Sequence, residues 1–309
     1  MNNDDEDQNQ VLINIDDGFY FKNIFLSVNL LKDHINVELS PDSLFLEFVD
    51  ETNRSYSKIT IFTSKIKNYV YNFRDDNGDL KPYHSMGFKA DEMITSAKSI
   101  TKHDGVLITL EKGLHLLKIV PRKSSLKDGE NIYDSFVNLL GAQELVFDDA
   151  EYSVDYSFKT PVKTFSEFCG VSINKKCLYI DVYGYKNGAI FVGKHSESKM
   201  ATRFAGGVTP DLNDIPQVKI DVSTNSIKKT INIMDPDGVI LYLKIPIKII
   251  KAITKFNNFA LKNSYIYFTI EQGKPLRISV DIHSFGNYTL LISDKETEAP
   301  SHKKKSKLR

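Results

Sequence analysis

The stretch Pro246-Ile-Lys-Ile-Ile-Lys-Ala-Ile-Thr-Lys-Phe256 predicts an amphipathic helix whose two faces differ in charge. At 100° per residue, one face collects the apolar side chains of Ile249, Ile250, Ile253, Phe256 and Ala260. The opposite face collects four lysines with no carboxylate among them: Lys248, Lys251, Lys255 and Lys262. We therefore expect a helix that packs on a core with one face and presents a lysine stripe on the other.

The residues after this helix predict a meander of three strands. Tyr265–Glu271, Leu276–Ile282 and Tyr288–Ser293 alternate between apolar and polar side chains, which is typical of half-buried strands. The tight turn Glu271-Gln-Gly-Lys-Pro275 separates the first two strands. Helix and strands together predict a positively charged surface on a rigid sheet.

The same unit occurs earlier in the chain. Ile108-Thr-Leu-Glu-Lys-Gly-Leu-His-Leu-Leu-Lys-Ile119 corresponds to Phe268–Val280, and it too follows an amphipathic helix with outer lysines, Ala90–Thr101. The first predicted helix, Asp17–Lys32, has its counterpart in Pro161–Ser172. Each half has the order helix, strands, helix, strands. The pattern indicates an internal duplication.

The duplication predicts an α+β protein with two similar domains. A chain of 309 residues with 41% hydrophobic content is long enough to bury two cores. The expected boundaries are a disordered acidic tail at 1–9, a first domain at 10–121, a connector at 122–150, a second domain at 151–293 and a disordered basic tail at 294–309.

Composition narrows the class of protein. Forty basic and forty acidic residues cancel, so net charge gives no sign of nucleic-acid binding, although charges can still segregate by face. The two cysteines, Cys169 and Cys177, match no metal-ligand spacing and favour a reducing compartment. No signal-peptide pattern and no apolar run of membrane-spanning length occurs. We expect an intracellular soluble protein.

The motifs that resemble catalytic sites favour structural interpretations. Gly188-Ala-Ile-Phe-Val-Gly-Lys194 has most of the phosphate-loop spacing, but its apolar interior is typical of a strand, and His195 replaces the magnesium-binding hydroxyl. Cys169 lies on the apolar face of its helix, which favours a core residue over a nucleophile. The histidines are scattered. The sequence predicts no enzyme, no cofactor and no metal site.

The lysine stripes carry the functional prediction. A single lysine face is most often only solvated, but here such a face recurs on three of the four predicted helices. If the duplication places all four helices on one side of a continuous sheet, their outer faces form one basic lining. Such a lining contacts phosphates without reading bases, and its binding is sensitive to salt.

In the order of these elements, residues 10–293 resemble the sliding clamps of the proliferating cell nuclear antigen family. The segments that carry the resemblance are Ser43-Leu-Phe-Leu-Glu-Phe-Val-Asp50, Asp149-Ala-Glu-Tyr-Ser153, Lys159-Thr-Pro161 with Phe165–Cys169, Lys274-Pro-Leu-Arg-Ile-Ser-Val-Asp281, and Gly286-Asn-Tyr-Thr-Leu-Leu-Ile292. The resemblance implies the DNA-clamp fold, with antiparallel sheets outside and helices lining the inner face. It also implies a closed ring, usually of three subunits, around duplex DNA.

The resemblance further implies partners and a location. Clamps tether DNA polymerase and other replication and repair proteins as processivity factors, and these proteins bind through short hydrophobic motifs. An ATP-dependent clamp loader places the ring on DNA, and the ring itself has no catalytic activity and no membrane contact. We expect a homotrimer in the nucleus, or in the replication compartment of a large DNA virus.

Three groups of site residues follow from the resemblance by position. The DNA-binding lysines are Lys22, Lys32, Lys98, Lys102, Lys163, Lys248, Lys251 and Lys255. The partner-peptide pocket is formed by Val49, Tyr56, Leu145, Phe147, Pro275, Leu291 and Ile292. The subunit interface contains Tyr133, Phe136, Ala189, Phe191 and Lys194, with Ala189–Lys194 pairing edge to edge with a strand near Tyr133–Leu140.

Departures from the family pattern leave alternatives open. The third helix has Glu167 and Gly170 where family members often carry arginines, so only Lys163 remains there. The loop 195–217 is long, and the basic tail at 303–307 is a targeting signal, a DNA-touching arm or an inert tail. The alternative functions are a subunit of a heteromeric clamp or a clamp-derived viral transcription factor. An enzyme on a duplicated scaffold would need a convergent polar pocket.

Overall fold

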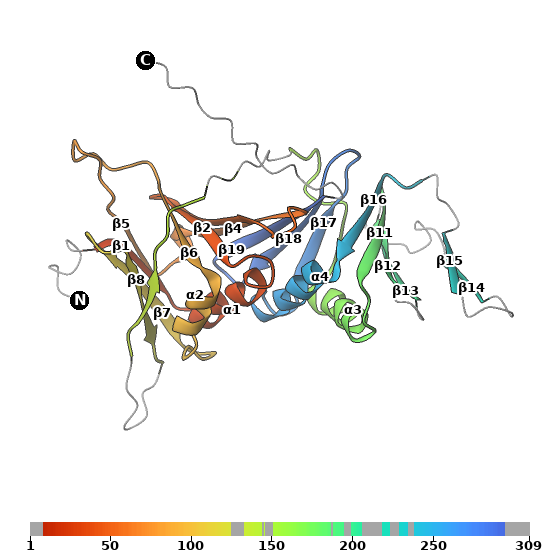
Figure 1. Cartoon of the computed structure of the whole chain (residues 1–309), viewed down its shortest axis with the longest axis horizontal. Helices are drawn as coiled ribbons and strands as arrows, with labels where there is room; N and C mark the ends of the chain where they lie inside the picture. Colours follow the sequence, from red (N-terminus) through yellow and green to blue (C-terminus); the bar gives the residue numbers. More distant parts are fainter. Residues whose placement is uncertain are drawn as a thin grey trace, which may run out of the picture.

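The computed structural model describes residues 9–124, 133–143, 145, 151–186, 188–194, 199–205, 218–222, 229–233 and 238–293. For 194, 199–201, 203, 205, 218–222 and 229–233 only the backbone is described. Antiparallel sheets form the upper layer and both ends of the molecule in Figure 1, and the helices lie together below the central sheet.

The described part of the chain contains four α-helices, two in each half. They are α1 (Gly18–Val28), α2 (Ala90–Ser96), α3 (Val162–Asn174) and α4 (Ile247–Thr254). The strands of the first half are β1 (Asn9–Ile15), β2 (His34–Leu39), β3 (Ser43–Val49), β4 (Ser55–Phe62), β5 (Asn68–Tyr71), β6 (His84–Lys89), β7 (Gly105–Glu111), β8 (Leu116–Arg122) and β9 (Ser135–Asn138).

The second half repeats this succession of strands, with an additional hairpin. Its strands are β10 (Phe158–Pro161), β11 (Tyr179–Tyr185), β12 (Gly188–Lys194), β13 (Lys199–Ala205), β14 (Val218–Val222), β15 (Lys229–Ile233), β16 (Leu241–Pro246), β17 (Tyr265–Thr269), β18 (Leu276–Ile282) and β19 (Gly286–Ile292).

The order of strands confirms the internal duplication. In the first half, β4-β3-β2-β6 form one run of neighbours, and β13-β12-β11-β16 form the same run in the second half. Likewise, β1-β7-β8-β9 corresponds to β10-β17-β18-β19. Strands β19 and β4 pair antiparallel along their whole length, which joins the two halves into one eight-stranded sheet.

All four helices lie on the same side of this eight-stranded sheet (Figure 1). Helix α1 contacts α2 and α4, and α3 packs against α4. Across the join between the domains, the Ser27 hydroxyl of α1 donates a hydrogen bond of 3.0 Å to the carbonyl oxygen of Ala252 in α4. The expected arrangement, helices on one face of a continuous sheet, is therefore confirmed.

Apolar helix faces pack into one hydrophobic core that continues through both halves of the chain, as the 3.6-residue period predicts for each helix. Ile249, Ile250 and Ile253 of α4 are at most 1% exposed. In the second domain, the rings of Phe158 and Phe268 stack with their centroids 4.5 Å apart. Cys169 is fully buried, and Gly188–Lys194 is a strand, so both structural interpretations of these segments are confirmed.

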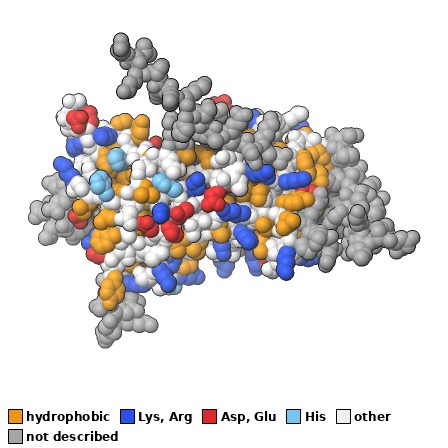
Figure 2. Space-filling view, viewed as in Figure 1, with side chains coloured by type: hydrophobic (Ala, Val, Ile, Leu, Met, Phe, Trp, Pro, Cys, Tyr) orange, Lys and Arg blue, Asp and Glu red, His pale blue; other side chains and the backbone are white. Residues whose placement is uncertain are grey.

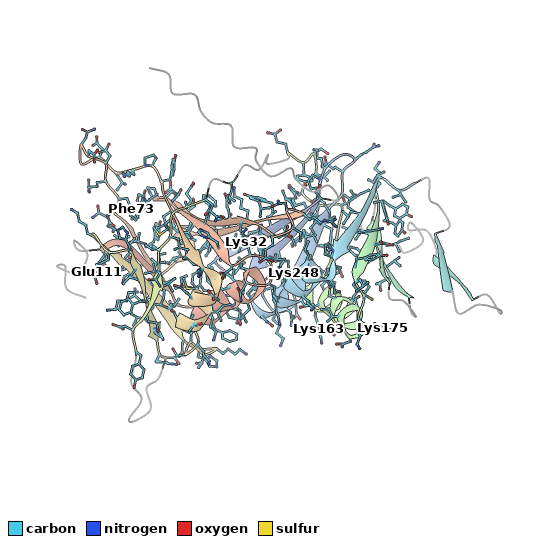
Figure 3. All side chains as sticks on the ribbon, viewed as in Figure 1. Lys32, Phe73, Glu111, Lys163, Lys175 and Lys248 are labelled. Carbon is cyan, nitrogen blue, oxygen red and sulfur yellow. The ribbon has the colours of Figure 1, made fainter. Side chains whose placement is uncertain are left out.

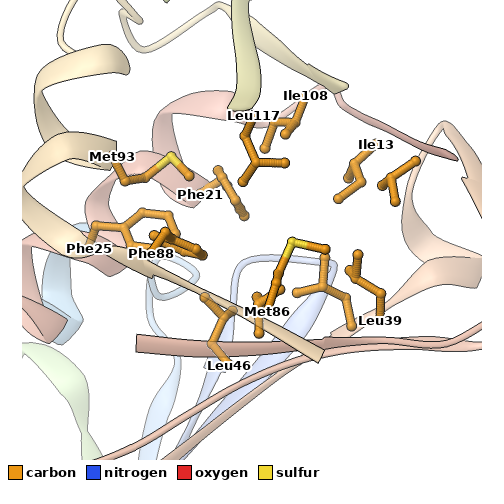
Figure 4. A pocket seen from close by; sticks show the side chains of 13 residues that line it. Ile13, Phe21, Phe25, Leu39, Leu46, Met86, Phe88, Met93, Ile108 and Leu117 are labelled. Carbon is orange, nitrogen blue, oxygen red and sulfur yellow. The ribbon is translucent and has the colours of Figure 1, made fainter. Parts of the chain in front are cut away.

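The core of the first domain encloses one small cavity (Figure 4). Its volume is about 30 Å³, and side chains such as Phe21, Met86 and Met93 line it. All thirteen lining residues are apolar, so a water molecule inside would find no side-chain hydrogen-bond partner. The cavity is a packing defect and has no room for a ligand.

Three helices end earlier than their apolar period predicts. Helix α1 ends at Val28, and α4 ends at Thr254, after which Lys255–Asn258 form a 3₁₀ turn. Helix α2 ends at Ser96, and Thr101, where the helix was expected to end, instead donates its backbone N–H and hydroxyl to the Asp104 carboxylate. These local hydrogen bonds compete with the helix.

No helix within the described residues is long and apolar enough to span a membrane.

Candidate nucleic-acid interface and subunit edges

The helical side of the molecule carries a band of basic side chains. Figure 2, in the orientation of Figure 1, shows Lys and Arg side chains along the lower margin, which the helices form. Four of the predicted DNA-binding lysines are exposed: Lys98, Lys102, Lys163 and Lys251. Lys255 is half-buried.

One open groove on this side gathers lysines from both domains. Lys102 of the first domain lines it together with Lys163 and Lys262 of the second. Phe19 and Tyr20 of α1 form an apolar part of the wall. None of the described lining residues is acidic. Three further amide side chains line the groove: Asn257, Asn258 and Asn263.

This groove is suited to an anionic ligand, because ammonium and amide groups donate to phosphate oxygens without regard to base sequence. Lys262 belonged to the predicted stripe, but sequence reasoning did not assign it to DNA binding. Its proximity to Lys102 depends on the packing of the two domains, so only the tertiary structure brings these side chains together.

Lys22 is engaged inside the first domain. Its ammonium group donates a hydrogen bond to the carbonyl oxygen of Ile100 and lies 5.4 Å from the centroid of the Phe19 ring. Burial, with a smaller contribution from the nearby Lys123, lowers the pKa of Lys22. These contacts engage the Lys22 ammonium group within the first domain, and the assignment of Lys22 to DNA binding stays a prediction.

Lys248 also has a partner that the helix pattern does not reveal. Its ammonium group forms an ion pair with the carboxylate of Glu51, which follows β3 in the first domain. The hydrogen bond from Lys248 lowers the pKa of Glu51, and Lys32 contributes a smaller favourable charge. In Figure 3, Lys32 and Lys248 lie near the middle of the view, whereas Lys163 and Lys175 lie lower, beside α3.

Helix α3 carries more positive charge than the sequence analysis assigned to it. Besides Lys163 in its first turn, Lys175 and Lys176 lie just beyond its C-terminal end and are exposed. Cations at this position interact favourably with the helix dipole. Glu167 is exposed on the same helix, as predicted, so α3 has lysines at both ends and an acidic residue between them.

Three of the predicted pocket residues lie in one row across neighbouring strands. Val49 of β3 is opposite Tyr56 of β4, and Tyr56 is opposite Leu291 of β19. Ile292, the next residue along β19, is fully buried in the main core. Because successive strand residues point to opposite faces, Leu291 and Ile292 cannot share a pocket, and the assignment of Ile292 is wrong.

Hydrogen bonds hold the connector at its first end. The side-chain oxygen of Asn36 in β2 accepts the backbone N–H of Gln143 at 2.9 Å, and its amide nitrogen donates to the Gln143 carbonyl. Gly87 and Leu140 exchange two backbone hydrogen bonds of 2.8 and 2.7 Å. Leu145 is half-buried, and Phe147 lies outside the described residues.

The second end of the connector is held by the turn between β17 and β18. The Glu271 carboxylate accepts the backbone N–H groups of Ser153 and Val154 and forms an ion pair of 2.6 Å with Lys274. These contacts, led by the hydrogen bond from Lys274, lower the pKa of Glu271 to about 2. Pro275, a predicted pocket residue, accepts a hydrogen bond from the Tyr152 hydroxyl at its carbonyl oxygen.

The predicted subunit interface is only partly at sheet edges. Tyr133 and Phe136 are 72% and 54% exposed, and Phe136 lies in β9, the edge strand of the five-stranded sheet. Ala189 and Phe191 are fully buried in β12, which pairs with β11 on one side and β13 on the other. The prediction that Ala189–Lys194 is an edge is therefore wrong.

The physical reason is the strand β13, which lies in the segment 195–217, where the sequence predicts a long loop. Lys199–Ala205 pairs with β12 over its whole length and becomes the edge of the four-stranded sheet. Lys194 pairs with Lys199 at the end of this ladder.

The described residues contain no group of three or more His, Cys, Asp and Glu that could hold a metal ion. Burial raises the thiol pKa of Cys169 and of Cys177, which keeps both thiols protonated and unreactive at neutral pH.

Comparison with known proteins identifies the fold. No family model matches the sequence, and neither does any curated protein. Among solved structures, the chain is similar to the proliferating cellular nuclear antigen from Entamoeba histolytica, with a TM-score of 0.67 and 11% identity over 93% of this chain and 99% of that one.

The chain is also similar to the structure of a PCNA2–PCNA3 complex from Sulfolobus tokodaii, with a TM-score of 0.65 and 12% identity over 92% of this chain and 99% of the matched chain. The similarity spans both domains, and at this level of identity it concerns the fold. The chain has the two-domain fold of proliferating cell nuclear antigen, as the sequence resemblance predicted.

Proposed function

We propose that this protein is a DNA sliding clamp, a closed ring of three identical subunits that encircles duplex DNA. The observation that carries the proposal is the position of the four helices. They lie on one side of a sheet that crosses both domains (Figure 1), and Lys and Arg side chains follow the margin that the helices form (Figure 2). A ring with this side inward has a basic channel and an outer wall of strands.

The internal repeat supports a specific way to close the ring. Strand β9 corresponds to β19 by the repeat, and β13 corresponds to β4. Because β19 pairs with β4 within the chain, β9 of one subunit would pair with β13 of the next. In this junction β13, rather than the predicted segment Ala189–Lys194, is the strand that pairs with the neighbouring subunit. Tyr133 and Phe136 remain interface residues.

The proposed mechanism is topological. A closed ring cannot leave DNA sideways, so individually weak phosphate contacts suffice, and the ring slides because each contact exchanges readily. Lys98, Lys102, Lys163, Lys251 and Lys262 supply these contacts. The chain's neutral net charge is compatible with this role because only the inner face must be positive.

Partner proteins would dock on the opposite side of the sheet from the helices. The row formed by Val49, Tyr56 and Leu291 lies on that side, and the connector is held at 143 and at 153. We propose that short hydrophobic peptides of DNA polymerase and other replication and repair proteins bind there. In this proposal an ATP-dependent clamp loader opens the ring and places it on DNA. The protein would act in the nucleus or in a viral replication compartment.

Two measurements test the ring. Light scattering should give three times the chain mass of 35.1 kDa at micromolar concentration. Rings assembled in the presence of a closed circular duplex should remain bound to it in high salt and be released when one cut makes the circle linear. Equal retention on circular and linear duplexes would contradict topological binding.

A heteromeric ring is the second candidate. The similar structure from Sulfolobus tokodaii is a complex of two different chains, and Glu167 makes the inner face of α3 mixed in charge. If this candidate is correct, the purified chain stays below three-subunit mass alone and reaches ring mass when co-expressed with a second clamp subunit.

A further inference from the structure

The outward edge of β9 is the edge at which a further strand would add to the five-stranded sheet. At the end of the β8–β9 ladder, the backbone N–H of Leu139 donates to the carbonyl oxygen of His115. Backbone groups of successive strand residues point in alternate directions, so every second residue of β9 bonds to β8. The backbone groups of Phe136 and Asn138 therefore point away from β8, toward the outward edge.

Two side chains of α2 bind the backbone of this edge. The Glu92 carboxylate accepts hydrogen bonds from the backbone N–H and the side-chain amide of Asn138, at 3.0 and 3.1 Å. The Ser96 hydroxyl, four residues later on the same helix face, donates to the carbonyl oxygen of Phe136 at 3.2 Å. One carboxylate and one hydroxyl thus bond to a donor and an acceptor that an added strand would use.

The covering continues past the end of β9. Leu140 is the next residue that points outward, and it exchanges two backbone hydrogen bonds with Gly87 of β6. The outward-facing residues 136, 138 and 140 therefore each bond to α2 or β6 of their own chain. A strand edge that stays uncovered pairs with other strands, and contacts of this kind prevent such pairing.

The join between β19 and β4 shows the corresponding edge in its paired state. Helix α4 follows β16 as α2 follows β6, so Ile249 and Ile253 stand at the positions of Glu92 and Ser96. Both isoleucines are at most 1% exposed and belong to the hydrophobic core. Strand β19 pairs with β4 over its whole length instead. The helix thus has polar side chains beside the edge that is open in the single chain, and apolar ones beside the edge that is paired.

We infer that Glu92 and Ser96 form a removable cap, which competes with a second copy of this chain for the edge of β9. The inference rests on the proposed ring and adds the regulation of its junction. The backbone N–H of Asn138 and the carbonyl of Phe136 would bond to the strand of the neighbouring copy, so closing the ring requires α2 to release them.

The cap has two consequences for assembly. It protects the single chain from pairing with unrelated strands before a neighbouring copy arrives. It also weakens the ring, because the hydrogen bonds to α2 are lost when the new strand pairs. A carboxylate suits this role, since Glu92 is only half-buried and its charge returns to water at little cost once it is released.

The test removes the cap in the full-length protein. Glu92→Ala combined with Ser96→Ala should lower the concentration for half-assembly about tenfold, because the single chain loses hydrogen bonds that the ring does not use. Sedimentation of fluorescently labelled protein over a dilution series measures this concentration. Ser96→Ala alone should lower it by less, because the hydrogen bond from a neutral hydroxyl is weaker than one to a carboxylate.

Asp91→Ala is the matched control. It removes the same charge from the same turn of α2, but the Asp91 carboxylate accepts the backbone N–H of Glu92, within its own helix. The half-assembly concentration of this control should stay within about twofold of that of the unmodified protein. Equal shifts in Asp91→Ala and Glu92→Ala would show that the charge of the turn, and not the cap, affects assembly.

Hydrogen exchange gives a second measurement that does not depend on assembly. In samples diluted to the single chain, the backbone amide of Asn138 should exchange about tenfold faster in Glu92→Ala than in the unmodified protein. In assembled rings this amide should be protected equally in both proteins, because the neighbouring strand then accepts its hydrogen bond.

The sign of the change in assembly decides the inference. Tighter assembly of the double variant, with an unchanged control, supports the cap. Unchanged or weaker assembly of the double variant overturns it and leaves the ring in place, and so does equal exchange of the Asn138 amide with and without Glu92. If the unmodified protein stays at 35.1 kDa at every concentration, the ring itself fails, and the inference fails with it.

Discussion

The groove lysines and Lys248 carry the same charge in very different surroundings. Lys102, Lys163 and Lys262 line an open groove whose described lining residues include no carboxylate. Lys248 forms an ion pair with Glu51, from the other domain. The difference shows that a lysine stripe on a helix indicates where cations lie, whereas their availability to a ligand depends on what the fold places beside them.

The largest effect on DNA affinity is expected from removing the three lysine charges that line the groove. Replacing Lys102, Lys163 and Lys262 with alanine should lower affinity for a short duplex between about tenfold and a hundredfold near physiological salt. The slope of log affinity against log salt should fall by up to about 2.7, because each lost phosphate contact removes about 0.9. Fluorescence anisotropy across a salt series measures both quantities.

A control with the same loss of charge is available in the turns between strands. Lys65, Lys112 and Lys186 are exposed and do not line the groove. Their replacement with alanine should change the affinity by less than the groove variant and leave most of the salt slope. Equal losses from both triple variants would show that only total charge matters.

The second effect is on stability. Lys22→Ala removes the hydrogen bond to the Ile100 carbonyl and should lower the free energy of unfolding by about 1 kcal/mol. Duplex affinity should stay within about twofold, because Lys22 is engaged inside the domain. Urea denaturation and anisotropy measure the two quantities, and a large loss of affinity in a stable variant would show that Lys22 contacts DNA.

The third effect depends on pH, through a carboxylate near Lys22. Burial alone would raise the pKa of Asp104, but hydrogen bonds from Thr101 and Lys123 outweigh it and lower the pKa to about 2. The ionised carboxylate therefore stabilises the fold fully above about pH 4, and this contribution is lost as pH falls toward 2.

Asp104→Asn removes this dependence. The unmodified protein should lose on the order of 1 kcal/mol more stability than the variant between pH 5 and pH 2.5, after allowance for solvent screening. Thermal unfolding at the two pH values gives the difference. Parallel losses in both proteins would mean that Asp104 is not the group that titrates.

The smallest effect is expected from Lys248→Ala. Because Glu51 already neutralises this ammonium group, its removal should change duplex affinity by less than about twofold. Lys163→Ala removes the same charge from the groove and should cost more. If the two single variants lose equal affinity, the pairing with Glu51 does not limit the availability of Lys248.

Much of the fold could be predicted from the sequence because local geometry determines it. The spacing of Phe21, Phe25 and Val28 predicts α1, and the repeat of Ile108–Ile119 in Phe268–Val280 predicts two similar domains. The strand β13 was missed because Lys199–Ala205 lies between segments with no clear periodicity. That omission made the buried strand β12 look like an edge.

The candidate site was predicted less completely. The exposed lysines at 98, 102, 163 and 251 were found from helix periodicity and from the resemblance. Lys262 and Lys175 were not assigned, because one depends on domain packing and the other lies just past the end of its helix. The alternation rule alone could have separated Leu291 from Ile292, once the strand they share is recognised.

The sequence by itself determined which side chains share a helix or strand face, since side-chain direction follows from periods of 3.6 and 2.0 residues. Only the tertiary structure decided which strands lie at the edges of the sheets. It also decided which lysines have a carboxylate beside them, as Lys248 does. Glu51 and Lys248 are 197 residues apart in the chain, and no local pattern brings them together. Their contact, like the covering of β9 by Glu92, exists because separate elements pack in one particular order.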